Sequence, residues 1–246
     1  MHIYIGVDDT DSIGSRGTGF RCRQMGSELT LAGHGKVLGI TRHQLFFHPS
    51  IPYTSQNSSN CLEVETPDMK KLWDFCKQFL HREAIDGSDV GLCVVESGQI
   101  EPVIENWGIR AKKEILTQDE AKQLARSNGV LLEGLTGTFD GIIGALAAVG
   151  LRKSGNDGRF IWQPGKQLRD LTGSMTIEQL LNKTQIDGVL TKEGKLLTDN
   201  EMIDLTDWVR AVLINKKTYI LAEQNLKKSG NDWKTADKTY IKELSS

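Results

Sequence analysis

An acidic motif near the N-terminus constrains this chain more than any other feature of its sequence. The segment Asp8-Asp9-Thr10-Asp11-Ser12 directly follows a β-branched run, Ile3 to Val7, that predicts a first strand. Carboxylates this close together repel one another unless a cation joins them. Mg²⁺ suits such oxygen ligands, and it binds one or two carboxylates together with phosphates and water. The motif therefore predicts a metal site formed by Asp8, Asp9 and Asp11, with Thr10 and Ser12 beside it.

A glycine-rich turn follows the motif and precedes a predicted helix from Phe20 to Leu31. In this turn Gly17 and Gly19 would let the backbone approach an anion, and free N–H groups at a helix N-terminus favour phosphate. Thr18 is then the hydroxyl placed to receive or coordinate a phosphoryl group, and Arg21 would neutralise its charge. The two features together predict a nucleotide site. Taken alone, the acidic motif fits a solvated turn that caps the helix equally well.

Arg42 and Asn57 belong to a second candidate region. Arg42 lies in a predicted strand, Lys36 to Phe47, and Asn57 lies in a following loop that contains Pro, Ser and Asn. An arginine from a strand, with amides and hydroxyls from a loop, would shape a substrate pocket. The same residues also fit an ordinary polar loop.

A third region combines a small loop with a helix. Gly137 and Thr138 precede a predicted buried helix, Phe139 to Leu151, and are interpreted as a second contact to an anion or to adenine. Gly141 and Gly144 recur at near-helical spacing, which favours close packing of this helix on a neighbouring element.

The whole pattern predicts an α/β (α+β) protein in two parts. Strands alternate with helices in the first part and shorter strands dominate the second, so we expect domains at 1–160 and 161–246. The formal net charge of -2 excludes binding of nucleic acid through bulk charge alone. Neither a long apolar run nor a signal peptide is present, so no membrane contact is expected. Scattered cysteines without a CxxC pair indicate a reducing, cytoplasmic environment and no zinc ribbon.

The three regions, in this order, resemble the archaeal tRNA(Ile) agmatinylcytidine synthetase family (TiaS). The similarity rests on three blocks, namely IGVDDTDS with RGTG, GITRHQLFFHPSIPYTSQNSSN, and GTFDGIIGALAAVGLR. The resemblance implies a mixed-sheet, kinase-like domain that is followed by, or interleaved with, a ferredoxin-like domain. It also implies use of ATP and Mg²⁺ to phosphorylate a threonine of the domain itself and the wobble cytidine of tRNA, after which agmatine displaces the activated group.

Carried over by position, the resemblance places Asp8, Asp9 and Asp11 in the family's metal-binding motif and Thr18 at its autophosphorylated threonine. The OB-fold and zinc-ribbon domains of the family have no counterpart that we recognise in this sequence. The expected function is an ATP- and Mg²⁺-dependent phosphotransferase or ligase whose acceptor is tRNA or a small molecule.

Two other functions compete with this expectation. A nucleotide- or RNA-binding module without phosphoryl transfer is the main alternative. An acyl-transfer hydrolase lacks a partner base for Thr18 at a recognisable spacing. If RNA is the acceptor, the candidate contact is a basic C-terminal group, Lys216, Lys217, Lys227 and Lys228.

Overall fold

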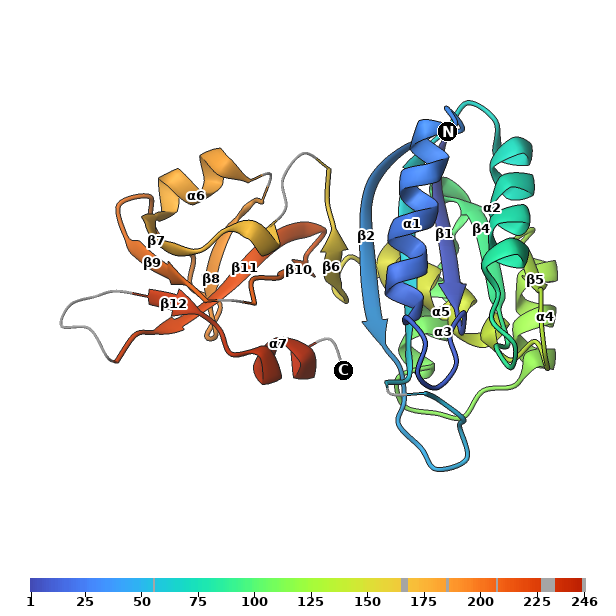
Figure 1. Ribbon diagram of the computed structural model, residues 1–246. Helices are drawn as coiled ribbons and strands as arrows, with labels where there is room; N and C mark the ends of the chain where they lie inside the picture. The colour runs from blue at the N-terminus through green and yellow to red at the C-terminus, as the bar shows by residue number, and fades with distance from the viewer. Residues whose placement is uncertain (55, 165–167, 185, 207, 227–232, 245–246) are drawn as a thin grey trace. The chain divides into compact units, whose positions relative to one another are not determined.

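The computed structural model describes residues 1–54, 56–164, 168–184, 186–206, 208–226 and 233–244. Two compact units divide the chain, Met1–Ser154 and Gly155–Ser245 (Figure 1). The boundary expected after residue 160 falls inside β6 (Arg159–Trp162), which belongs to the second unit. The α+β class with a mixed sheet is confirmed.

The strands of the first unit follow the order β5-β4-β1-β3-β2, and their recorded pairs are antiparallel. They are β1 (His2–Asp8), β2 (Lys36–Gln44), β3 (Ser58–Glu65), β4 (Gly91–Glu96) and β5 (Leu131–Gly134). The path β1-α1-β2-β3-α2-β4, with β1 and β3 in the centre, is the ferredoxin-like arrangement. This connectivity runs through the first unit, which agrees with the interleaved form of the two arrangements that the resemblance implies.

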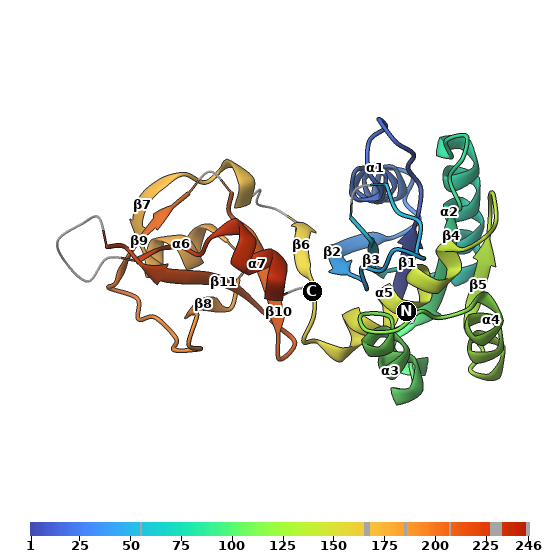
Figure 2. The same cartoon turned by 90° about the horizontal axis from the view of Figure 1, so that it is seen from below.

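Helices cover both faces of this sheet (Figure 2). One face carries α1 (Thr18–Leu31) and α2 (Met69–Glu83), and the other carries α3 (Pro102–Arg110), α4 (Gln118–Ser127) and α5 (Gly141–Ser154). The 3-10 turn η1 (Ser97–Gln99) leads from β4 to α3. Thr117 and Glu120 form a capping box at the start of α4, with both of its hydrogen bonds present.

Small residues bring α5 into backbone contact with the sheet. A Cβ atom at Gly6 of β1 would lie 1.9 Å from the carbonyl oxygen of Ala145, and one at Gly91 of β4 would lie 2.1 Å from the carbonyl carbon of Gly141. This close approach confirms the packing interpretation of Gly141 and Gly144. It also brings the N-terminus of α5 to the carboxyl end of β1.

The strands of the second unit follow the order β6-β10-β11-β12-β9-β7, with β8 parallel to β11. The strands are β7 (Gly173–Thr176), β8 (Gly188–Thr191), β9 (Met202–Leu205), β10 (Ala211–Ile214), β11 (Lys217–Gln224) and β12 (Trp233–Thr235). The 3-10 turn η2 (Leu168–Asp170) precedes β7. The larger hydrophobic core of the second unit includes Leu180 of α6 (Ile177–Lys183), and a smaller core includes Ile241 of α7 (Lys238–Leu244).

A hairpin turn at Asn215 and Lys216 joins β10 to β11, with φ of 50° at Asn215 and 62° at Lys216. Lys227 and Lys228 lie outside the described residues. All four cysteines are free and buried. Over the described ranges, no helix is long and apolar enough to cross a membrane.

Candidate active site

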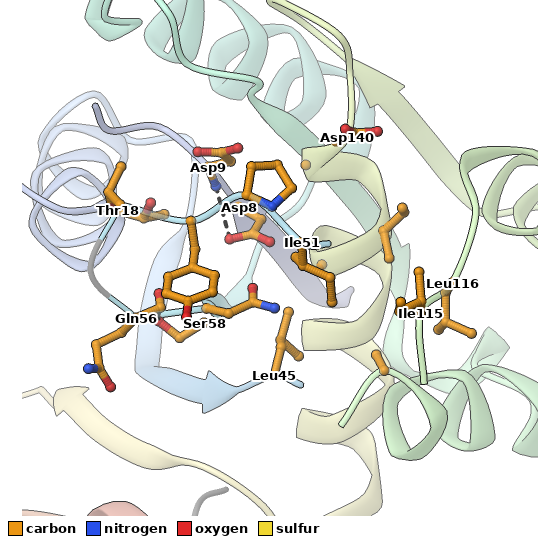
Figure 3. Close-up of a pocket in the computed structure, with 18 of the residues that line it drawn as sticks. Asp8, Asp9, Thr18, Leu45, Ile51, Gln56, Ser58, Ile115, Leu116 and Asp140 are labelled. Atoms are coloured by element: carbon orange, nitrogen blue, oxygen red, sulfur yellow. Dashed lines mark hydrogen bonds between the residues drawn. The ribbon is translucent and has the colours of Figure 1, made fainter. Parts of the chain in front are cut away.

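A pocket of about 180 Å³ opens at the carboxyl end of β1 and is the candidate site (Figure 3). The acidic motif, the start of α1, the β2–β3 loop, the α3–α4 connection and the start of α5 together form its walls. Five side chains chosen from the sequence line it, those of Asp8, Asp9, Asp11, Thr18 and Asn57. The structure thus brings the acidic motif, the threonine and the loop amide to one place.

Asp8 is partly accessible from the pocket but densely surrounded by protein. Its Oδ1 accepts a hydrogen bond from the Asp9 N–H at 2.9 Å (Figure 3), and Gly144 of α5 packs on its other oxygen. A Cβ atom at Gly144 would lie 1.7 Å from Asp8 Oδ2. Burial raises the pKa of Asp8 well above its ordinary value, and the charge of Asp9 raises it further. Among the described lining residues there is no Lys, Arg or His, so this carboxylate meets no cation in the pocket wall.

Asp9 is held in an uncommon backbone conformation, with φ of 53°. Burial, followed by the charges of Asp89, Asp11 and Asp140, raises the pKa of Asp9 to about 6. A strained residue whose ionised form is disfavoured is typical of a functional site rather than of a solvated turn.

Asp11 anchors both the start of α1 and the β2–β3 loop. Its Oδ1 accepts from the Thr18 N–H at 3.1 Å and from Thr18 Oγ1 at 2.7 Å, and its Oδ2 accepts from Thr54 Oγ1 at 2.8 Å. Thr18 is only 6% exposed, and its Oγ1 also accepts from the Thr10 N–H at 3.2 Å. The distance from Thr18 Oγ1 to Asp11 Oδ1 is within the range that a general base needs.

The three aspartates do not form a ready-made metal cluster. In the part of the chain that the structure describes, no three His, Cys, Asp or Glu side chains lie close enough to share an ion. Asp11 uses both of its oxygens, whereas Asp8 Oδ2 and the Asp9 carboxylate have no hydrogen-bond partner among these residues. Two open carboxylates still fit Mg²⁺, because this ion commonly takes one or two carboxylates and completes its shell with phosphate and water.

Thr10, Ser12, Gly17 and Gly19 shape the turn and do not line the pocket. The Ser12 N–H donates to a serine hydroxyl within the turn, and Gly17 is the N-cap of α1 with φ of -64°. Any residue adopts that angle, whereas a positive φ in this turn occurs at Gly14, with φ of 88°. Gly17 and Gly19 therefore contribute the absence of a side chain rather than an unusual conformation.

Arg21 and Arg42 also lie outside the pocket wall. Arg21 forms an ion pair with Glu83 of α2 at 2.7 Å. The Nε of Arg42 donates to Ser58 Oγ at 2.8 Å, and burial lowers the pKa of this guanidinium, opposed by the charges of nearby aspartates. Arg21 thus joins two helices, while Arg42 acts on the site through its charge and through Ser58, which lines the pocket.

Gly137 and Thr138, in the loop before α5, position Asp89 instead of lining the pocket. The Thr138 N–H donates to Asp89 Oδ1, and Gly137 adopts φ of 60° against the same carboxylate. Gln118 of α4 donates to Asp140 Oδ1 at 2.6 Å and so fixes a carboxylate that does line the pocket. The direct anion or adenine contact expected of Gly137 and Thr138 is not what the geometry shows.

An apolar wall of the pocket was not predicted from the sequence. Leu45 and Ile51 face the same cavity as Ile115 and Leu116 (Figure 3). Ile115 is 51% exposed, which is ordinary for a single apolar residue in a connection and gave no sequence signal. The proline-containing loop was recognised only for its polar residues.

The site as a whole is an acidic pocket between the N-termini of α1 and α5, with an apolar wall, on a ferredoxin-like sheet. Helix N-termini carry partial positive charge and favour anions, while the carboxylates favour a cation. This combination defines an α+β unit suited to a metal-associated anionic ligand.

Comparison with known proteins confirms the resemblance to TiaS. An uncharacterized protein of Methanocaldococcus jannaschii is 31% identical over 156 residues, which cover 61% of this chain and 49% of that protein. The tRNA 2-agmatinylcytidine synthetase TiaS of Pyrococcus horikoshii is 28% identical over 156 residues, covering 61% of this chain and 36% of that enzyme. The crystal structure of TiaS in complex with its isoleucine tRNA and ATP has a TM-score of 0.54 at 26% identity, covering 61% of this chain and 36% of that one. No protein-family model matches the sequence.

The similarity covers only part of each related protein. The chain spans about half the length of the Methanocaldococcus protein and about a third of TiaS. The matched length is close to that of the first unit, Met1–Ser154.

Proposed function

We propose that the first unit is an ATP- and Mg²⁺-dependent phosphotransferase or ligase similar to the catalytic part of TiaS, with tRNA or a small molecule as acceptor. One observation carries the proposal: Asp8, Asp9, Asp11 and Thr18 meet in one pocket beside two helix N-termini. The similarity to TiaS, for which an ATP complex is known, supports ATP as the nucleotide.

Asp8 and Asp9 would hold Mg²⁺, since both residues line the pocket and no Lys, Arg or His is found among its described lining residues. The bound ion supplies charge neutralisation for the phosphate oxygens. Without such a cation, the polyphosphate of ATP would meet a wall of carboxylates and be repelled. The cavity of about 180 Å³ lies below the usual range of about 300 Å³ or more for whole ligands, so it would enclose only part of a nucleotide.

Thr18 is the proposed phosphoryl acceptor on this chain. Its Oγ1 would bond to the γ-phosphorus as the bond from that phosphorus to the bridging oxygen of ADP breaks, and its proton would pass to Asp11 Oδ1, 2.7 Å away. Asp11 also fixes the position of Thr18 through the backbone N–H. Positioning and charge neutralisation account for most of the catalysis in phosphoryl transfer, and both are supplied here by the acidic motif.

Incubation with γ-labelled ATP and Mg²⁺ tests this proposal. The wild type should incorporate label, and Asp8→Asn and Thr18→Val should not. Thr30→Val is the matched control, because Thr30 lies in the same helix but bonds the carbonyl oxygen of Gly26, away from the pocket. Absence of ATP binding by the wild type at millimolar ATP would contradict the proposal.

A nucleotide- or RNA-binding module without turnover is the second candidate function. The low exposure of Thr18 and the engagement of both Asp11 oxygens favour it. It predicts saturable ATP or tRNA binding with no transfer of phosphate. Binding of tRNA would weaken as salt rises, because phosphate contacts release counterions.

A further inference from the structure

Asn57 presents a hydrogen-bond acceptor of fixed orientation to the pocket. Its Nδ2 donates to the main-chain oxygen of Phe46 at 2.7 Å. A carbonyl oxygen only accepts, so the amide of Asn57 must turn its NH₂ toward Phe46 and its Oδ1 away. Within the described chain, Asn57 Oδ1 has no hydrogen-bond partner, although Asn57 lines the pocket.

The backbone around Asn57 is held equally firmly. Its main-chain oxygen accepts from the Leu45 N–H at 2.8 Å and from Gln44 Nε2 at 2.5 Å. Asn57 is therefore attached to the end of β2 by its main chain and to Phe46 by its side chain. A free acceptor held in this way needs no reorganisation when a ligand donates to it.

The surroundings of Asn57 indicate what kind of ligand would donate. Leu45, to which Asn57 is bonded, belongs to the apolar wall with Ile51 and Leu116. The ionisable side chains that line the described pocket are, apart from the phenol of Tyr53, all carboxylates, so the wall is rich in acceptors. An apolar wall with an acceptor at its edge suits a flat ring that carries an N–H donor.

We propose that Asn57 Oδ1 accepts a hydrogen bond from the exocyclic amino group of a nucleobase seated against the apolar wall, and so selects amino-bearing rings over keto-bearing ones. The inference rests on the proposed nucleotide-dependent function. The 6-amino group of adenine is a donor, whereas a 6-keto oxygen is an acceptor, and cytosine differs from uracil in the same way at position 4. A keto ring would place two acceptors face to face and leave both unpaired.

Titration calorimetry with ATP, ITP, CTP and UTP, each with Mg²⁺, tests the assignment. We expect the wild type to bind ATP about tenfold more tightly than ITP, which corresponds to loss of one buried hydrogen bond. Asn57→Ala should bring that ratio close to one. Asn57→Asp removes the donor to Phe46 but keeps an acceptor, so it should lower thermal stability and retain the preference for ATP.

The ratio of the ATP affinity to the ITP affinity distinguishes base selection by Asn57 from a purely structural role, because a structural role would weaken the binding of both nucleotides equally. A preference for CTP over UTP that Asn57→Ala abolishes would also support the proposal and would assign the ring to a pyrimidine. Equal binding of both members of each pair, or a preference that survives in Asn57→Ala, overturns the assignment while leaving nucleotide binding intact. Failure of the wild type to bind any of the four overturns the proposed function as well.

Discussion

Glu63 and Asp8, two acidic residues of the sheet in the first unit, lie at opposite ends of α5 and differ in their partners. Basic side chains pair with Glu63, whereas none lines the pocket at Asp8 among the described residues. Glu63 of β3 accepts from Arg152, in the last turn of α5, and from His2 at 2.6 Å. Asp8 of β1 packs on Gly144, in the first turn of the same helix, and no basic side chain lines its described pocket. A buried carboxylate that forms no ion pair lowers the stability of the fold. Proteins therefore retain one mainly where a bound ligand supplies the opposite charge. This difference favours a structural role for Glu63 and Arg152 and makes the pocket at Asp8 the candidate ligand site.

The largest expected effect is on stability at the Glu63 end. Arg152→Met should lower the free energy of unfolding by about 3 kcal/mol, because it leaves Glu63 charged, enclosed and short of its main partner. Lys153→Met, one residue along, is the control. Urea denaturation measures both, and equal small losses would show that the pair at this end contributes little.

Asp8→Asn should have the opposite effect on stability and a large effect on function. Phosphate labelling from ATP should fall by about 100-fold or more, since a ligand for the metal and phosphates is lost. The melting temperature without Mg²⁺ at pH 7.5 should rise, because burial raises the pKa of Asp8 and disfavours its charged form. Asp119→Asn, at a position outside the pocket, controls for the change in net charge. A lower melting temperature for Asp8→Asn would mean that the Asp8 charge is already compensated.

The acidity of Asp9 predicts a pH dependence of stability. The pKa of Asp9 is raised from 3.8 to about 6, so its folded form keeps a proton that the unfolded form has lost. The favourable contribution is complete below pH 3.8 and is lost as pH rises through about 6. The difference in melting temperature between wild type and Asp9→Asn should therefore grow from about pH 5 to about pH 7.5. Mg²⁺ should reduce that difference at the higher pH, and a flat difference without Mg²⁺ would refute the assignment.

The smallest expected effect concerns the bond between Thr54 and Asp11. Thr54→Val removes a single exposed hydrogen bond and should cost about 1 kcal/mol or less. Thr66→Val removes the bond from a buried threonine to the His34 carbonyl oxygen and should cost more. Thermal unfolding compares the two variants. A larger loss in Thr54→Val would mean that Asp11 depends on the loop for its position.

Patterns of neighbouring residues predicted several helices and strands of the first unit. They did not predict which strands pair with one another. The strand β1 and the buried helix α5 each follow from the pattern of neighbouring residues, and both were predicted. The pairing of β1 with β3 and β4 joins residues far apart in the chain, so alternation alone gave no order. The strands β7 and β9 are four residues each, too short for a clear periodicity, and both were missed.

Of the candidate site, only the polar part was predicted from the sequence. Asp8, Asp9, Asp11 and Thr18 were found because hydroxyls and carboxylates crowd into one motif. The apolar wall depends on how two separate connections approach each other in space, which no local pattern reports. Gly6, a single glycine inside β1, was an unused signal, because such a glycine often marks close approach of another backbone.

The contact between Gly144 and Asp8 has a consequence for how this chain tolerates mutation. One added methyl group at residue 144 would claim the space that an Asp8 oxygen occupies. Gly144→Ala would therefore displace the Asp8 carboxylate and impair the proposed site, although the aspartates and Thr18 all remain in the sequence. A sequence comparison that considers only the acidic motif and Thr18 would classify such a variant as functional.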